Sequence, residues 1–258
     1  MGLLIEKRGP CTINMTILFF ILGLFVGSLI NCVAFRWIKG EQFIKGRSKC
    51  PRCNHELSAL DLIPILSFVL LKGKCRYCKS KISSQYIVIE IFTGILFALA
   101  YFYLNNIIFW FFIISILITL LLIDLKTFTI PDKILIPSIL ISFFYILVFD
   151  SSVISRLIGA GIWFAFFLFI NSVSRGKWMG FGDVKLAILL GFLSGWPNIL
   201  MAMFLSFFIG AIISIGLILF KNKNLKSEVP FAPFLIVGTL ITLFWGNLLI
   251  NWYLNLIL

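Results

Sequence analysis

Long apolar stretches recur along the whole chain and constrain its fold more than any other feature of the sequence. A helix needs about 20 residues to cross the hydrocarbon core of a bilayer. Most of the stretches reach that length, and only 12% of the residues are charged, against about 25% in an ordinary soluble domain. The sequence therefore predicts an all-α polytopic membrane protein with about eight transmembrane helices. The stretches cover residues 15–35, 85–104, 107–124, 133–149, 154–173, 184–196, 198–220 and 231–257.

The basic residues indicate the orientation. The net charge is +12, and 19 of the 22 Lys and Arg lie in segments 36–85, 125–133, 174–185 and 221–228. If the segments between apolar stretches alternate sides, these four share one side, which the positive-inside rule assigns to the cytosol. The stretch 184–196 is short for a crossing, but without it the last basic segment would lie outside. The charge pattern thus favours eight crossings, and a lipid bilayer rather than nucleic acid as the partner.

One polar insert, residues 36–84, separates the first two apolar stretches. It contains two CxxC motifs, in which two tight turns each deliver a pair of thiolates, the arrangement that tetrahedral zinc needs. Disulfides are the less favoured use in a cytosolic loop. A redox-active dithiol and a loop without metal stay open as alternatives. The predicted zinc ligands are Cys50, Cys53, Cys75 and Cys78.

The chain has only ten acidic residues, so each carboxylate within or beside an apolar stretch can be weighed. Glu90 lies inside the second stretch, where a carboxylate is costly unless it is paired or faces water. Asp124 ends the third stretch, and taken alone it is a helix-end residue that reaches water. Asp132 and Asp183 fit the first turn of a helix, where the helix dipole favours a negative charge.

The pair Asp124 and Asp183 suggests more than either residue alone, because the predicted topology brings both to the same membrane face. Two carboxylates held close together cannot both ionise easily, so one keeps a proton. The ionised partner can take a proton from water while the protonated one hydrogen-bonds a scissile carbonyl. This arrangement predicts aspartic proteolysis. Gly180 and Gly182 would let an extended substrate approach the backbone.

Taken in order, the motifs of the chain resemble those of the type IV prepilin peptidases, also called type 4 leader peptidases. The resemblance covers nearly the whole chain, and the ordered set is far more specific than the GxGD motif alone. The motifs are Gly27-Ser28 with Asn31 and Arg36, the two CxxC motifs with Asp61, Pro64 and Ser67 between them, Ser83 with Tyr86 and Glu90, Asp124 with Ile130-Pro131-Asp132, Gly180-Phe181-Gly182-Asp183, and Pro230-Phe231-Ala232-Pro233-Phe234-Leu235.

The resemblance implies an aspartic endopeptidase that removes basic leader peptides from type IV prepilins or pseudopilins. It implies a bacterial inner-membrane protein whose active site faces the cytosol. Many family members also N-methylate the new N-terminus with S-adenosylmethionine, so that cofactor is expected if methylation is retained. The implied parts are an N-terminal segment with the first helix (1–35), a cytosolic zinc-binding loop associated with methylation (36–84) and a seven-helix peptidase core (85–258).

The resemblance also implies roles for individual residues. Asp124 and Asp183 would be catalytic, and Gly180, Gly182, Lys185, Pro131, Asp132 and Glu90 would support them. A basic cytosolic face would repel a basic leader peptide, so we expect an exposed carboxylate near the site, Glu90 or Asp132, to guide the leader. The alternatives from other classes are a transporter or channel with an aspartate ion site and a scaffold whose zinc loop recruits a partner.

Overall fold

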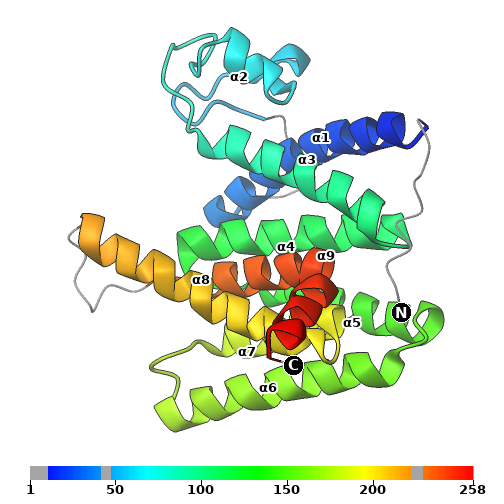
Figure 1. Ribbon diagram of the computed structural model, residues 1–258. Coiled ribbons are helices and arrows are strands. Elements are labelled where there is room, and N and C mark those ends of the chain that lie inside the picture. Colours follow the sequence, from blue (N-terminus) through cyan, green and yellow to red (C-terminus); the bar gives the residue numbers. More distant parts are fainter. Residues whose placement is uncertain (1–10, 42–47, 222–228, 258) are drawn as a thin grey trace. The chain divides into compact units, whose positions relative to one another are not determined.

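The computed structural model describes residues 11–41, 48–221 and 229–257 (Figure 1). Over these residues the chain is helical and forms no strand beyond isolated bridges, which confirms the predicted all-α fold. It divides into two compact units, the N-terminal unit (1–119) and the C-terminal unit (120–258). The helices are α1 (Cys11–Lys39), α2 (Leu66–Leu70), α3 (Gln85–Tyr103), α4 (Ile107–Thr127), α5 (Asp132–Phe149), α6 (Val153–Ser174), α7 (Phe181–Ser194), α8 (Asn198–Lys221) and α9 (Ala232–Ile257), with a 3₁₀ helix at Ala59–Leu62.

The N-terminal unit is built on the close packing of α1 against α3, which lie side by side in Figure 1. A Cβ atom at Gly27 would lie 2.8 Å from the Cα of Glu90, so the two backbones approach this closely only because position 27 is glycine. Asn31 follows one turn later. Its amide donates to the carbonyl oxygens of Gly27 and Tyr86, both at 3.2 Å, and ties the end of α1 to the start of α3. These contacts explain the glycine-to-asparagine motif of the first helix.

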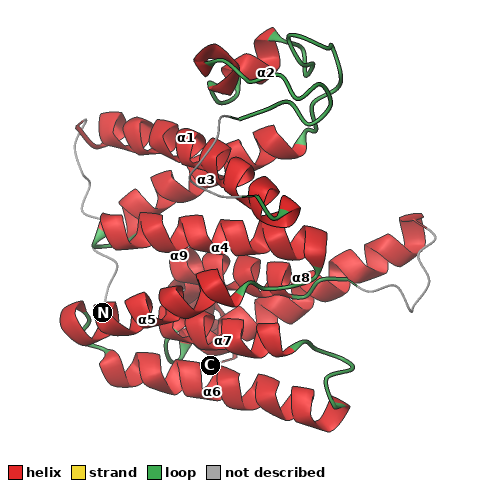
Figure 2. Cartoon of the chain, turned by 180° about the vertical axis from the view of Figure 1, so that it is seen from behind, coloured by secondary structure: helices red, strands yellow, loops and turns green. Residues whose placement is uncertain are grey.

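The segment between α1 and α3 is drawn mostly as loop in Figure 2, interrupted by the 3₁₀ helix and α2. Two isolated antiparallel bridges, Lys49 with Glu56 and Lys74 with Lys81, each close a short turn. Because each bridge encloses one CxxC motif, the four cysteines are carried by two similar turns rather than by flexible chain.

The C-terminal unit is organised around α7, which packs against α5, α6, α8 and α9. Most of its residues from Val184 onward are buried. A Cβ atom at Gly191 would lie 2.5 Å from the Cα of Ala160, so α6 and α7 are in backbone contact there. With 14 residues, α7 is only about 21 Å long. A helix enclosed by other helices does not need the length of one that faces lipid, because the polar groups at its ends can be buried in protein instead of reaching the membrane surface.

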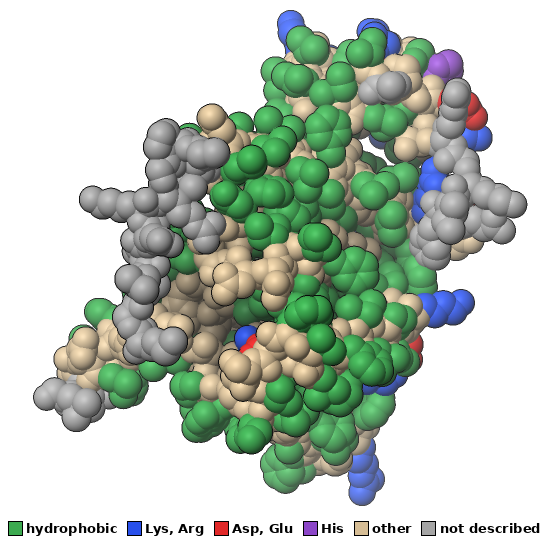
Figure 3. Space-filling model, turned by 90° about the vertical axis from the view of Figure 1, so that its right-hand side faces the viewer, with side chains coloured by type: hydrophobic (Ala, Val, Ile, Leu, Met, Phe, Trp, Pro, Cys, Tyr) green, Lys and Arg blue, Asp and Glu red, His purple; other side chains and the backbone are tan. Residues whose placement is uncertain are grey.

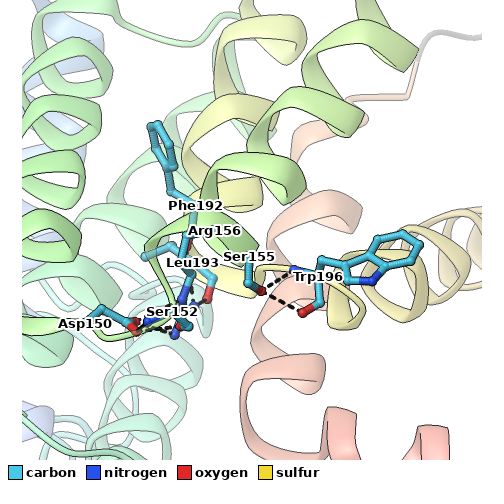
Figure 4. Close-up of polar contacts among 7 residues, drawn as sticks. All are labelled: Asp150, Ser152, Ser155, Arg156, Phe192, Leu193 and Trp196. Carbon is cyan, nitrogen blue, oxygen red and sulfur yellow. Dashed lines mark hydrogen bonds and ion pairs between the residues drawn. The ribbon is translucent and has the colours of Figure 1, made fainter.

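Polar contacts hold the C-terminal end of α7 against the start of α6, as Figure 4 shows. The guanidinium of Arg156 donates to the carbonyl oxygen of Leu193 at the end of α7. It also pairs with Asp150 at 3.1 Å. The hydroxyl of Ser155 donates to the carbonyl oxygen of Trp196 at 2.7 Å and accepts from its N–H at 3.0 Å. A cation at the last carbonyls of a helix satisfies groups that have no partner within the helix.

Seven of the described helices are long and apolar enough to cross a membrane, namely α1, α3, α4, α5, α6, α8 and α9. The sixth apolar stretch, 184–196, forms α7, which is helical as expected but shorter than the 18 residues of the shortest of these seven spans. Hydrophobic side chains cover most of the face drawn in Figure 3. Together these features establish a multi-pass membrane protein.

We expect Arg156→Met to lower the stability of the C-terminal unit. The substitution keeps an apolar stem but removes the donors to the α7 carbonyls and leaves Asp150, which is only 18% exposed, without its cation. Loss of such a charged hydrogen bond costs about 1–3 kcal/mol, so the midpoint of thermal unfolding in detergent should fall. Arg175→Met, at an exposed arginine just after α6, is the matched control. Equal midpoints for the two variants would contradict this role of Arg156.

Candidate active site and metal centre

Asp124 lies near the C-terminal end of α4, in the part of that helix that belongs to the C-terminal unit. The side chain is 4% exposed and follows a run of buried leucine and isoleucine. Among the described residues its Oδ2 atom has no hydrogen-bond partner. A buried carboxylate without a partner is costly to ionise, so such a group holds a proton or awaits a ligand or water.

Asp183 is the third residue of α7, after Gly180, whose extended backbone begins the helix. Its carboxylate is half-buried and lies close enough to Asp124 for the two charges to interact. Burial and the Asp124 charge raise the pKa of Asp183 to about 7, and the backbone of Gly180 acts in the opposite direction. The carboxyl of Asp183 therefore keeps its proton to a pH well above that of an ordinary aspartate.

Both aspartates line one pocket with a volume of about 300 Å³. Every lining residue belongs to the C-terminal unit and comes from the end of α4, the α4–α5 connection, the start of α5 or the start of α7. Three carboxylates and one lysine supply the charged groups. The lining residues are Asp124, Phe128, Thr129, Ile130, Asp132, Gly180, Gly182, Asp183 and Lys185.

The two glycines of the pocket differ in their surroundings. A Cβ atom at Gly182 would lie 3.3 Å from the Cβ of Ile130, so this glycine lets α7 pack tightly against the α4–α5 connection. At Gly180 the atom nearest to an added Cβ would be an oxygen of the Asp183 carboxylate, at 3.9 Å. A Cβ atom thus meets no close contact at Gly180, whereas at Gly182 it would be tightly packed.

Pro131 and Asp132 begin α5. Pro131 precedes the first helical residue in an extended conformation, which suits its fixed φ angle, and Asp132 occupies the first turn. Both Asp132 carboxylate oxygens accept a hydrogen bond from the Lys185 ammonium, at 2.8 and 2.7 Å. The sequence motifs contain Asp132 and Lys185 but do not show that the two interact. The structure brings their charges together although they lie 53 residues apart in the chain.

Phe128 is a pocket residue that the sequence reasoning missed. Its φ angle is +56°, a left-handed conformation that is unusual for a bulky side chain. The ring is 52% exposed, and it also lines an apolar pocket of about 470 Å³ between α4, α8 and α9. Phe128 therefore forms a wall shared by the polar and the apolar pocket. No sequence signal marks it beyond its position between Asp124 and Pro131.

The chain is similar to known proteins over most of its length. Residues 21–104 match a family described as the bacterial peptidase A24 N-terminal domain, and residues 111–215 match the type IV leader peptidase family. A protein of Aeromonas salmonicida named prepilin leader peptidase/N-methyltransferase is 34% identical over 82% of this chain and 76% of its own length. A protein of Bacillus subtilis with the same name is 32% identical over 95% of this chain and 100% of its own length.

The chain belongs to the type IV leader peptidase family. A relative from Legionella pneumophila, again named prepilin leader peptidase/N-methyltransferase, is 31% identical over 92% of the chain and 95% of its own length. No solved structure matches the chain. The resemblance seen in the sequence motifs is thereby confirmed. The family consists of aspartic peptidases, which agrees with a pocket that contains two interacting carboxyl groups.

The four cysteines of the N-terminal unit lie close enough together to hold a metal ion, because their Sγ atoms are all within 4.8 Å of one another. The Sγ atoms of Cys50 and Cys78 are 3.9 Å apart, near the roughly 3.8 Å that two thiolates have in a tetrahedral zinc site. In each motif the first cysteine is buried, Cys50 at 5% and Cys75 at 4% exposed. The predicted ligand set is therefore assembled in one place, and the structure fits a bound metal ion.

The two CxxC turns share one hydrogen-bond pattern. The N–H of Cys50 donates to the His55 carbonyl oxygen, and the N–H of Cys75 donates to the Ser80 carbonyl oxygen. The chain therefore reverses over the same number of residues in both turns. Asn54 and Lys79, the residues after the second cysteines, both have positive φ angles, of 55° and 58°. This repeated geometry directs the four thiols to one point.

Asp61 connects the 3₁₀ helix Ala59–Leu62 to the second CxxC turn. Its carboxylate accepts hydrogen bonds from the hydroxyl of Ser58, at 2.8 Å, and from the guanidinium of Arg76, at 2.7 Å. Burial opposes ionisation here, but these hydrogen bonds outweigh it and hold the pKa of Asp61 below its usual value. Asp61 therefore caps the 3₁₀ helix and ties it to Arg76 of the second CxxC turn.

Glu90 occupies a different environment from the one expected. Its side chain is 7% exposed, and its carboxylate accepts a hydrogen bond from the N–H of Ile65 at 2.9 Å. Ile65 has a φ angle of +61°, so Glu90 stabilises a strained turn before α2. The expectation that Glu90 is an exposed carboxylate is wrong, because the loop folds over it. Asp132, with 51% of its side chain exposed, fits that description.

We expect the purified protein to carry one metal ion per chain and Cys75→Ser to lose it, since a hydroxyl is a far weaker ligand than a thiolate. Elemental analysis of the detergent-solubilised protein measures the metal. Cys32→Ser is the matched control, because Cys32 contacts Ser48 at 3.7 Å and is not a member of the cluster. Equal metal content in the two variants would argue against the cluster as the binding site.

Proposed function

We propose that this protein is a prepilin leader peptidase that cleaves basic leader peptides from type IV prepilins or pseudopilins. Its active site would face the cytosol from the bacterial inner membrane. The observation that carries the proposal is that Asp124 and Asp183, two carboxyl groups whose charges interact, line the same pocket. Membership in the leader peptidase family, and the name shared by the relatives from Aeromonas and Bacillus, support the substrate class.

In the proposed mechanism the two aspartates share one proton. The protonated carboxyl donates a hydrogen bond to the carbonyl oxygen of the scissile peptide and makes its carbon more electrophilic. The ionised carboxylate takes a proton from a water molecule, which then attacks that carbon. The amine leaves after it receives the proton from the first aspartate. Asp183 is the better candidate for the protonated partner at neutral pH, since its pKa is raised to about 7.

The surroundings suit this chemistry. Gly180 leaves open space beside the Asp183 carboxylate, where an extended substrate backbone can lie. The apolar wall formed by residues such as Ile130 and Phe128 lowers the local dielectric constant and strengthens the hydrogen bonds to a developing oxyanion. Water reaches the pocket from the side of Asp132, which is half-exposed.

Zinc is the metal we assign to the cysteine cluster. Four thiolates without an open position suit a structural site, so zinc would stabilise the loop and take no part in peptide cleavage. Methylation of the new N-terminus, named among the relatives' activities, would require S-adenosylmethionine. The described loop contains short helices and isolated bridges but no nucleotide-binding fold, so we assign no residue to that cofactor.

The three-part organisation proposed from the sequence, with a cytosolic loop at 36–84 between the first helix and a peptidase core, is retained. The transporter and scaffold alternatives do not explain the family membership, and a scaffold gives no role to the two interacting aspartates. An ion pathway would need polar groups continuing across the membrane from Asp124, whereas the preceding residues of α4, from Leu117 to Ile123, are mostly apolar and buried.

We expect Asp124→Asn and Asp183→Asn each to lower the rate of leader cleavage by about 10²–10⁴-fold, because an amide can neither accept the proton of water nor pass one to the leaving amine. The measurement is cleavage of a prepilin-like protein by membranes with matched amounts of each variant. Glu41→Gln, at an exposed carboxylate outside the pocket, is the control. Full activity in either aspartate variant would refute the dyad, and no cleavage by the wild type would return the transporter and scaffold alternatives.

A second expectation concerns pH. Asp183 loses its proton as the pH rises through about 7, and two ionised carboxylates cannot supply the acid that the mechanism needs. The value of kcat/KM should therefore fall above pH 7 by about tenfold per unit. The measurement uses membranes and a substrate without histidine near the scissile bond. A flat profile between pH 6 and pH 9 would exclude Asp183 as the proton-carrying partner.

A further inference from the structure

An ion pair lies in the same pocket as the two aspartates and has no part in the cleavage mechanism described above. Lys185 lies on α7, two residues after Asp183, and its ammonium donates to both carboxylate oxygens of Asp132. Lys185 is the only cation among the residues that line the pocket. The Asp132 carboxylate is therefore already paired with a cation of the protein itself.

The two partners of the pair differ in exposure. The Asp132 side chain is 51% exposed, against 29% for Lys185. A cation arriving from water can thus reach the carboxylate without first removing the lysine. The lysine also has a second contact within reach, since its ammonium lies 5.3 Å from the centre of the Phe181 ring. An aromatic face attracts a cation, so Lys185 can leave Asp132 without becoming wholly unpaired.

The other charges facing the pocket favour a cationic ligand. Asp124 and Asp183 line the same pocket as the pair, and one of the two is ionised in a working dyad. Lys133, the neighbour of Asp132, is exposed and does not line the pocket. With Asp132 neutralised by Lys185, the pocket retains a net negative charge. A positive side chain of the substrate is attracted into it, whereas a negative one is repelled.

We infer that Asp132 is a binding subsite for a lysine or arginine side chain of the substrate and that Lys185 occupies this subsite in the free protein. The incoming cation replaces Lys185 at the Asp132 carboxylate, and Lys185 moves toward Phe181. Asp132 thus selects substrates with a positive charge near the scissile bond, and Lys185 weakens that selection by competition. The inference rests on the proposed leader peptidase function and gives its pocket a specificity.

The competition sets the size of the effect. Exposed ion pairs are weak, so removal of Lys185 should strengthen binding of a cationic substrate by only about two- to fivefold. Removal of the Asp132 charge should weaken binding of the same substrate, because the pocket loses its accessible carboxylate while Lys185 stays. A substrate without a positive charge should respond to neither change.

The experiment compares two forms of one prepilin-like substrate, one with its leader lysines and arginines intact and one with glutamine in their place. The enzyme variants are Lys185→Met, Asp132→Asn and the double variant, with Lys133→Met as the matched control. For the basic substrate, KM should fall two- to fivefold in Lys185→Met and rise in Asp132→Asn, and the KM of the glutamine substrate should show neither change. In the Asp132→Asn background, Lys185→Met should no longer lower KM, because the carboxylate for which it competed is gone.

Three outcomes would overturn the inference. A loss of kcat for both substrates in Lys185→Met would assign Lys185 to the chemistry. A KM that falls equally in Lys133→Met would reduce the effect to general surface charge. Unchanged KM values in all variants would leave Asp132 without a role in binding. These outcomes are distinct from failure of the proposed function, which would appear as absent cleavage of both substrates by the wild type.

Discussion

The buried carboxylate of Asp124 is the constraint on which the candidate site depends. At 4% exposure it is removed from water, and among the described residues one of its oxygens has no partner. Such a group would destabilise the fold if it were required only for packing, since a leucine there would cost nothing in desolvation. Its presence beside Asp183 is explained when the two share a proton, because the shared state carries a single charge. The same sharing equips the pair for acid and base work in one step.

That arrangement requires α7 to be fixed along its axis, and the architecture of the C-terminal unit provides this. The helix is too short to be held by lipid, so four neighbouring helices enclose it. Gly191 allows backbone contact with α6, and Arg156 caps the far end. Asp183 at the start of α7 therefore derives its position from contacts that lie more than two helical turns away. Stability of the fold and geometry of the pocket are two consequences of the same packing.

The sequence predicted the parts of this protein that follow from local pattern and topology. Apolar length predicted the helices, CxxC spacing predicted the cysteine cluster, and alternation across the membrane brought Asp124 and Asp183 to one face. It did not predict the pairing of Asp132 with Lys185, which lie 53 residues apart on different helices. It also misjudged Glu90, because exposure depends on whether the loop folds over the start of α3. Phe128 escaped notice since its left-handed backbone is set by the chain reversal between α4 and α5, not by its own preference.

The pocket and the cysteine cluster are built from residues of different units. All the pocket residues lie in the C-terminal unit and all four cysteines in the N-terminal unit, so no side chain serves both. A metal held by four thiolates has no open position for water or a peptide carbonyl. In the mechanism proposed above, peptide cleavage rests on proton transfer between Asp124, Asp183 and water. The proposed selectivity rests on Asp132, the one pocket carboxylate that is both outside this pair and open to solvent.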